Sequence, residues 1–305
     1  MAHLITTLGT ISRDDVAMIL PHEHIFVDLR PGPQDLSHIQ AYEVVGLMAP
    51  EIGKIKKLGV SALVECTPEG CGRRADFVKA VSEATGFPIV VPTGMYREPW
   101  IPEWAHIATE EALRDWMLGE LQGEIKHSGV QAGWIKLSAG DDGLTECEKK
   151  ILRAAAQAGA ETNAVIGSHT VKGSVVQEQL DILEEAGYTP DRFIWIHTQN
   201  EPDLALHLDV ARRGAWIEYD AVGSDNLPDE FFVACIQDAL DAGLGDRVLL
   251  SHDRGWYDPA QPGGGTPQPF TYINEVFLDR LRTDGIDDAE IVQITQSNPF
   301  QAFAR

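Results

Sequence analysis

Residues 16–26 have the sequence VAMILPHEHIF, an apolar run that ends in His22 and His24. Its continuous apolar character is typical of a strand covered on both faces of a sheet. Neither a GxGxxG nor a GxxxxGK[ST] phosphate-binding loop follows it. A doubly wound open sheet would be expected to carry such a loop after its first strand. The stretch therefore favours a different parallel architecture.

Seven further runs of the same kind alternate with helix-like stretches along the chain. They occupy residues 60–67, 87–94, 132–138, 163–170, 192–198, 214–220 and 246–253. One of the helical stretches begins at Thr145, which stands three residues before Glu148 in the spacing of a capping box. Eight such units in 305 residues predict an α/β fold, a (β/α)8 TIM barrel. We expect one barrel domain over residues 1–305, with the doubly wound sheet as the alternative.

Charge and composition restrict the class of protein. The chain has 47 acidic and 24 basic residues, a net charge of −23 that disfavours nucleic acid and anionic membranes as partners. It has no apolar stretch long enough to span a membrane, and residues 1–15 lack the features of a secretory signal. Four cysteines without a CxxC pair fit a reducing compartment, so we expect a cytoplasmic protein. Cys66 and Cys71 are close enough for a metal site, although ordinary buried thiols are the simpler interpretation.

Polar residues gather at the ends of the predicted strands, where parallel barrels carry their active sites. His22 and His24 stand two apart, so both can face the same side of their strand. Later strand ends carry Lys136, His169, His197 and Asp253. So many side chains of this kind at one level are hard to explain as isolated polar residues of the core. The pattern predicts a metal site at the barrel mouth.

The other histidines have a different setting. We expect surface positions for His3, His38, His106, His127 and His207. His252 should point to the side of its strand opposite Asp253, or stand behind the ligands.

Lys136 requires its own explanation, because burying an ammonium group costs energy and favours the neutral amine. A neutral amine can add carbon dioxide, and the resulting carbamate has two oxygens that can bridge two cations. The alternative is a lysine paired with Asp253. In the predicted site, His22, His24 and Asp253 hold the more buried of two divalent ions. His169 and His197 hold the more exposed one, and carboxylated Lys136 bridges them. These donors suit Zn²⁺ best, and also Mn²⁺, Co²⁺ or Fe²⁺.

Several stretches together resemble the phosphotriesterase-related family of the amidohydrolase superfamily, which includes the phosphotriesterase-like lactonases. They are LPHEHI (20–25), AGWIKLSAG (132–140), GSHT (167–170), IWIHTQN (194–200) and LLSHD (249–253). The resemblance extends over nearly the whole chain, and all six candidate ligands match the family pattern. It implies a binuclear metal site with a carboxylated lysine. A metal-bridging hydroxide is then expected to attack the substrate, with Asp253 as catalytic base and then acid.

The loops after the strands are expected to select the substrate. Basic residues follow several strand ends: Arg73, Arg74, Arg97, Lys172 and Arg254. They suggest recognition of an anionic group, with ion pairing to nearby acids as the alternative. The substrate-binding candidates are Tyr96, Arg97, Lys172 and Arg254. The aromatic residues Trp100, Trp256 and Tyr257 are further candidates for the pocket wall.

These features favour a hydrolase acting on a small-molecule lactone or carboxylic ester, including an anionic (phosphorylated or carboxylated) sugar lactone. A phosphotriesterase and an amide (N-acyl) hydrolase are the alternatives among enzymes. A non-catalytic ligand-binding barrel is the alternative from another class. A homodimer is suggested by the resemblance alone.

Overall fold

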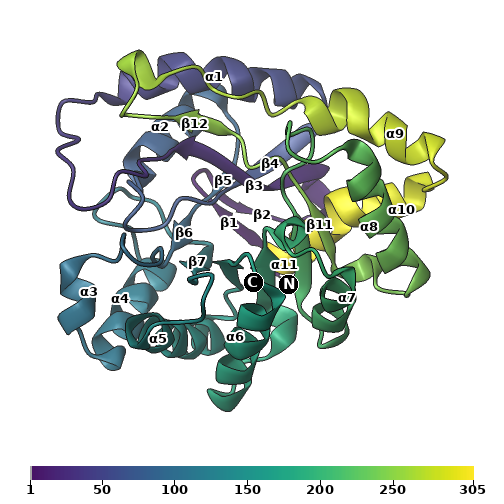
Figure 1. Cartoon of the computed structure of the whole chain (residues 1–305). Helices are drawn as coiled ribbons and strands as arrows, with labels where there is room; N and C mark the ends of the chain where they lie inside the picture. Colours follow the sequence, from purple (N-terminus) through teal and green to yellow (C-terminus); the bar gives the residue numbers. More distant parts are fainter. Residues whose placement is uncertain (1) are drawn as a thin grey trace.

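The computed structural model describes residues 2–305 and contains a barrel of parallel strands surrounded by helices (Figure 1). The barrel strands are β3 (Met18–Phe26), β4 (Val60–Glu65), β5 (Ile89–Val90), β6 (Pro92–Thr93), β7 (Trp134–Ser138), β8 (Ile166–His169), β9 (Phe193–Ile196), β10 (Trp216–Tyr219), β11 (Val248–Leu250) and β12 (Gly255–Tyr257). Each of the eight predicted runs contains at least one of them, and the third contains both β5 and β6. The predicted (β/α)8 barrel is therefore confirmed.

The barrel wall consists of two hydrogen-bonded sheets, β6-β7-β8-β9-β10-β11 and β5-β4-β3-β12. On one side the chain itself joins them, because β5 runs into β6 across Val91. On the other side the backbone N–H of Asp253 donates to the carbonyl of His22 at 3.2 Å, and that of His24 donates to Arg254 at 2.9 Å. The segment between β11 and β12 therefore closes the barrel beside two of the candidate ligands.

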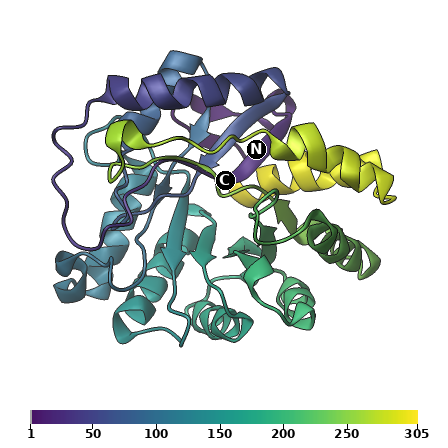
Figure 2. The ribbon, with the colours of Figure 1, turned by 45° about the horizontal axis from the view of Figure 1, so that its top comes forward.

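Helices cover the outside of this wall (Figure 2). They are α1 (Ala41–Lys57), α2 (Ala75–Thr85), α3 (Glu103–Ile107), α4 (Glu110–Gln122), α5 (Glu146–Thr162), α6 (Gly173–Glu185), α7 (Leu204–Arg212), α8 (Asp229–Asp241), α9 (Leu278–Thr283), α10 (Asp288–Val292) and α11 (Asn298–Phe303). Single π-helical segments, Ile273–Phe277 and Gln293–Ser297, lead into α9 and α11. Within residues 2–305, none of the helices combines the length and apolarity needed to cross a bilayer.

A short antiparallel hairpin near the N-terminus, β1 (Leu4–Thr6) with β2 (Gly9–Ile11), is not part of the barrel and was not expected from the sequence. It lies close to the other end of the chain, because His3 and Arg305 exchange backbone hydrogen bonds of 3.1 and 3.0 Å. The chain termini therefore meet.

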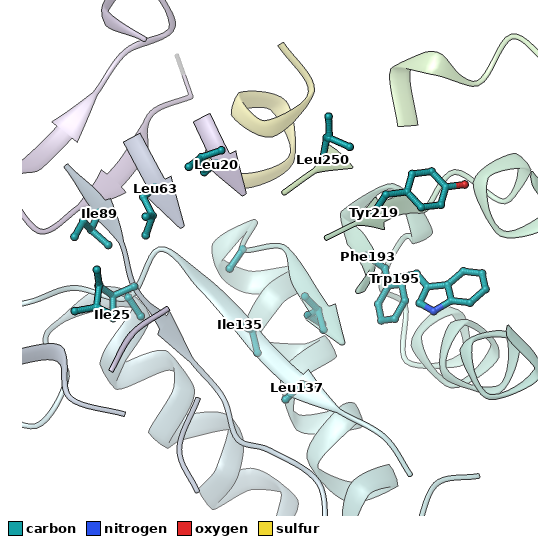
Figure 3. Packing of buried hydrophobic residues seen from close by; sticks show 14 of the residues in the cluster. Leu20, Ile25, Leu63, Ile89, Ile135, Leu137, Phe193, Trp195, Tyr219 and Leu250 are labelled. Carbon is teal, nitrogen blue, oxygen red and sulfur yellow. The ribbon is translucent and has the colours of Figure 1, made fainter. Parts of the chain in front are cut away.

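Buried apolar side chains form two groups, one on each side of the barrel wall. The outer group packs the strands against the helices and includes Leu20, Leu63, Ile89, Ile135, Phe193 and Leu250 (Figure 3). The inner group takes side chains from strands all round the barrel: Ile19, Val64, Val90, Trp134, Ile194, Trp216 and Leu249. Phe303 of α11 packs edge-on against Trp134, with ring centroids 5.2 Å apart. Each large side chain buried in this way contributes roughly 1.5–3 kcal/mol to folding.

The capping box predicted at the start of α5 is present. The hydroxyl of Thr145 accepts from the backbone N–H of Glu148 at 3.2 Å, and the Glu148 carboxylate accepts from the N–H of Thr145 at 2.8 Å. We expect Thr145→Ala to lower the free energy of unfolding by about 1 kcal/mol, because the backbone N–H of Glu148 loses its side-chain acceptor. Urea denaturation followed by circular dichroism measures the change. Thr145→Ser keeps the hydroxyl and is the control; equal losses in both variants would contradict the capping role.

Candidate metal centre

A cavity of about 130 Å³ lies at the C-terminal ends of the barrel strands. Its walls include all six predicted ligands, His22, His24, Lys136, His169, His197 and Asp253. The loops add Tyr96 and Trp256, and the end of β4 adds Cys66 and Thr67. Side chains from positions more than 230 residues apart in the sequence thus meet around one small space.

Regular alternation along the strands places two of the six side chains in this space. On β7, Lys136 follows Trp134 by two residues, and Trp134 belongs to the inner group. On β8, His169 likewise follows Gly167, whose position lies against the inner side chains Trp134 and Ile196. These two residues need no departure from strand geometry to face the cavity.

The histidines on β3 and after β9 face the cavity only because the backbone departs from regular strand alternation. Ile19 belongs to the inner group, so strict alternation would turn His22 outward, but the pairing of β3 with β4 shifts between Leu20 and Glu23. Such a bulge reverses the side on which the following residues point. Ile196 is also an inner residue, and His197 after it adopts a left-handed conformation with φ of 65°. Backbone strain of this kind costs about 1–3 kcal/mol per residue and is typical of functional sites.

Two glycines allow the backbone to pack closely beside the candidate ligands. A Cβ on Gly94 would lie 2.2 Å from the carbonyl oxygen of Lys136, and one on Gly255 would lie 2.1 Å from that of His24. Both glycines have φ near 100°. A side chain at either position would therefore displace the strand that carries a ligand.

Three of the histidine rings are held by hydrogen bonds at Nδ1. Nδ1 of His22 lies 3.0 Å from Glu218, that of His197 lies 2.7 Å from Asp220, and that of His24 lies 2.7 Å from the hydroxyl of Thr67. An Nδ1–H that donates to a carboxylate fixes the tautomer, leaving Nε2 as a lone-pair donor. This arrangement is the usual outer support of histidines that bind metals.

The fourth histidine, His169, lies against Tyr96 and His197. The Tyr96 hydroxyl is 3.2 Å from Nδ1 of His169, and the ring centroids of His169 and His197 are 4.3 Å apart. Burial lowers the pKa of His169 well below its ordinary value, and the neighbouring charge of His197 lowers it further. Burial also lowers the pKa of His22, with Lys136 as the next cause. Both rings are therefore neutral and can donate a lone pair.

Asp253 lies between the histidines of β3 and has a left-handed backbone, with φ of 57°. Its Oδ1 is 3.0 Å from Nε2 of His24 and 3.6 Å from Nε2 of His22, yet it has no hydrogen-bond partner of good geometry within residues 2–305. Burial raises the pKa of Asp253, but the contact with His24 outweighs it and lowers the pKa to about 2. Burial alone would lower the pKa of His24, but the contacts with Asp253 and Glu65 outweigh it and raise the pKa to about 9. The charge on His24 thus balances that of Asp253, a role that a bound cation would take over.

Lys136 is buried, with 2% of its surface exposed, and forms no ion pair with any acid of residues 2–305. The alternative of a lysine paired with Asp253 is therefore not what the structure contains. A buried amine among donors of this type fits a carbamate, because carboxylation replaces the ammonium with an anion that bound cations would neutralise. The donor set as a whole fits divalent cations that accept nitrogen and oxygen ligands. Among these residues, the donor atoms of His22, His197 and Asp253 lie within 4.8 Å of one another.

Several acidic residues behind the histidines were missed in the sequence. Glu218 and Asp220 stand on and just after β10, and Glu23 and Glu65 accept hydrogen bonds beside β3. Burial raises the pKa of Glu218 well above its ordinary value, and Asp220 raises it further. The signal was present, because Glu218 and Asp220 stand two apart at a strand end, as His22 and His24 do.

Two histidines outside the cavity differ in how well they were placed. The surface position predicted for His207 is wrong: it is buried on α7, with Nδ1 3.1 Å from the Tyr219 hydroxyl and Nε2 2.9 Å from the Glu201 carbonyl. The inner face of α7 makes polar contacts, and the composition of the sequence does not reveal them. His252 lies behind the ligands as expected, 2.6 Å from Glu23.

The predicted substrate-binding residues differ in their surroundings: some line a cavity and others form ion pairs with nearby acids. Tyr96 lines the cavity, whereas Arg97 pairs with Asp141 at 2.7 Å and Lys172 with Asp142 at 3.5 Å. Arg254 lines a second cavity, of about 540 Å³, which also includes Asp253. Its guanidinium group contacts the carbonyl of Gly223 and pairs with no acid of residues 2–305. Arg254 is thus the candidate whose charge is not already compensated.

The remaining basic residues support the ion-pairing alternative. Arg73 is buried and pairs with Glu120 at 2.6 Å and Glu69 at 3.2 Å, and Arg74 donates to Asp76 at 2.8 Å. These guanidinium groups stabilise the loops and are not free to bind an anion.

The aromatic and cysteine candidates also differ in their surroundings. Trp256 lines the cavity and packs edge-on against His24, and Trp100 packs behind Tyr96. Tyr257 instead stacks on Phe26 in the core. Cys66 and Cys71 are buried free thiols in the cavity wall, and burial raises the pKa of both. Within residues 2–305, neither thiol belongs to a group of donor atoms close enough to share a cation, which agrees with the simpler interpretation of these residues.

Known proteins match this chain over its full length. A profile of the phosphotriesterase family matches residues 2–303. The phosphotriesterase homology protein of Escherichia coli is 28% identical over 298 residues, which are 96% of this chain and 100% of the relative. The aryldialkylphosphatase of Saccharolobus solfataricus is 27% identical over 309 residues, or 97% of each chain.

Solved structures give the same result. One, described as "Molecular Engineering of Organophosphate Hydrolysis Activity from a Weak Promiscuous Lactonase Template", superposes with a TM-score of 0.88 at 28% identity and covers 99% of both chains. The match therefore includes every segment of the barrel. The chain belongs to the phosphotriesterase family and is a metal-dependent hydrolase.

Proposed function

We propose that this protein hydrolyses a lactone or another carboxylic ester with the help of two divalent cations. One observation carries the proposal: six side chains with metal-binding chemistry line a single cavity, and the Nδ1 atoms of His22 and His197 contact buried carboxylates. Rings held in this way present Nε2 to a cation.

The proposed ligands divide between two positions. His22, His24 and Asp253 would hold one cation, His169 and His197 the other, and Lys136, as a carbamate, would contribute to both. Zn²⁺ suits these donors best. Bound cations would polarise the carbonyl oxygen of the substrate and lower the pKa of the attacking water.

The chain's own residues then orient the substrate and move the proton. Asp253 has a buried oxygen without a hydrogen-bond partner in residues 2–305, so it can accept the proton of the attacking water and later give it to the leaving alcohol. Burial raises the pKa of Tyr96 well above its ordinary value, so its hydroxyl stays protonated at the cavity wall. It can therefore donate a hydrogen bond to a substrate oxygen. No side chain needs to act as a nucleophile.

One similar structure was engineered from a promiscuous lactonase template toward organophosphate hydrolysis, which agrees with either an ester or a phosphotriester as the substrate bond. The similarity to an aryldialkylphosphatase favours the second candidate, a phosphotriesterase. The second cavity favours the ester. Its wall combines apolar side chains, such as Leu227 and Phe231, with polar ones, among them Gln199, Asn200 and Arg254. A hydroxylated or anionic ester can hydrogen-bond to the polar part of this wall, which a neutral organophosphate uses less.

A hydrolysis screen on metal-loaded protein tests the proposal directly. Simple lactones, phosphorylated sugar lactones, aryl esters, N-acyl compounds and a neutral phosphotriester are compared by kcat/KM. We expect an ester or lactone to exceed the phosphotriester. A strong preference for the phosphotriester would establish the second candidate instead.

The role of Asp253 predicts a specific kinetic defect. Asp253→Asn keeps the size of the side chain and one oxygen donor but removes the proton acceptor. We expect kcat to fall at least 100-fold, which is typical for the loss of general acid–base catalysis. Metal content, measured by atomic emission, should fall much less. A parallel loss of metal and activity would assign Asp253 a purely structural role.

The role of Lys136 predicts chemical rescue. Lys136→Ala removes the amine that would carry the carbamate, so metal binding and activity should both be lost. A short carboxylic acid such as propionate, added with Zn²⁺, fits the vacated volume and should restore part of the activity. Lys136→Met fills that volume and should not be rescued. An active Lys136→Ala protein without added acid would disprove the carbamate.

The uncompensated charge of Arg254 predicts selectivity for anionic substrates. Arg254→Gln should raise KM for a phosphorylated or carboxylated lactone about 10-fold or more, because a charge-assisted contact is worth about 1.5–3 kcal/mol. KM for a neutral lactone should change little. Arg97→Gln is the matched control, since Arg97 is already paired with Asp141. Equal effects of Arg254→Gln on both substrates would exclude anion recognition.

A further inference from the structure

A second group of metal-binding side chains lies outside the barrel cavity. Glu98, His106 and Cys147 each offer one donor atom, and these three atoms lie within 4.8 Å of one another. Oε1 of Glu98 is 3.4 Å from Nε2 of His106. The three residues come from separate segments: the loop after β6, helix α3 and the first turn of α5. The cavity of the proposed function includes none of them.

The neighbours of Cys147 on α5 hold the other two segments in place. The Glu148 carboxylate accepts the backbone N–H of Glu98 at 3.2 Å. The Lys150 ammonium donates to the carbonyl of His106 at 2.9 Å, and also to those of Ala105 and Ala108 at the end of α3. One helix therefore carries one of the donors and fixes the backbone of the two residues that carry the others. A group positioned in this way loses little conformational freedom when it binds a ligand.

The chemistry of the three donors selects the ligand. A thiolate, an imidazole and a carboxylate together suit Zn²⁺, which takes sulfur, nitrogen and oxygen ligands in a tetrahedral arrangement. Ca²⁺ and Mg²⁺ prefer oxygen ligands alone. The partial exposure of His106 and Glu98 gives a cation access from solvent, and the net charge of −23 attracts cations to the surface.

We propose that Glu98, His106 and Cys147 form a zinc site distinct from the barrel centre, with water as the fourth ligand. Binding releases the proton of the Cys147 thiol, because the thiolate is the form that binds metal. The site joins α3 and α5 to the loop that carries Tyr96, only two residues before Glu98. Zinc here would stabilise one wall of the substrate cavity.

Cobalt substitution tests the proposal, because Co²⁺ bound to a thiolate has a near-ultraviolet charge-transfer band that nitrogen and oxygen ligands lack. The full chain, loaded with excess Co²⁺, should show this band, and Cys147→Ser should lose it. Equilibrium dialysis should find one Co²⁺ fewer per chain in the double variant His106→Ala, Cys147→Ser. Hydrolysis by both variants should persist, since neither residue lies at the barrel cavity.

Two controls keep the result specific. Glu146→Gln removes a charge from the same turn of α5 and should leave the band intact. Cys71→Ser tests the thiol in the wall of the barrel cavity and should also leave it intact. A band that survives Cys147→Ser, or equal Co²⁺ content in the wild type and the double variant, would overturn the proposal. In that case Glu98 and His106 form only a surface ion pair.

Discussion

The contact between imidazole rings and buried carboxylates is the interaction on which the rest of this molecule depends. Glu23, Glu65, Glu218 and Asp220 are almost fully buried at the barrel mouth. Carboxylates in such a place are costly unless positive charge or hydrogen bonds compensate them. Glu218 is incompletely compensated by the protein alone: its Oε1 has no hydrogen-bond partner within residues 2–305, and burial and then Asp220 raise its pKa. Bound cations would supply the missing charge, so metal binding and barrel stability are expected to be coupled.

Much of the fold and of the candidate site could be predicted because both follow from regular strands. Continuous apolar runs gave the barrel, and the positions of Lys136 and His169 follow from simple alternation along β7 and β8. The sequence places His197 at a strand end but does not predict which way its side chain points. That orientation requires a left-handed backbone, which no residue pattern indicates. The bulge that turns His22 inward is equally hidden in the sequence. The candidate ligands were therefore chosen from residue type and strand end, and the geometry that makes them converge was not predicted.

The residues that could not be predicted are those whose partners lie far away in the sequence. Arg73 finds Glu120, and Arg97 finds Asp141, across gaps of more than 40 residues. Local acids were the natural candidates in the sequence, and Glu69 and Asp76 do pair with arginines, but tertiary packing also supplied Glu120 and Asp141. His207 is an exception, since its partners Tyr219 and Glu201 lie only 12 and 6 residues away. Basic loop residues thus indicate anion binding only when the folded chain leaves them unpaired, as it does for Arg254.

The shared position of Asp253 explains how such a chain could select an anionic substrate despite its charge of −23. Asp253 lines both the small cavity of the proposed metal site and the larger polar cavity that holds Arg254. At physiological ionic strength, charges more than about 8 Å apart in solvent are largely screened. The acidic surface is therefore expected to have little influence inside the mouth, where Arg254 and the proposed cations would lie closest to the substrate. An ester placed with its carbonyl in the small cavity would extend its substituent past Asp253 toward that guanidinium. Asp253 would then lie beside the reacting bond and also between this bond and the group that binds the rest of the substrate.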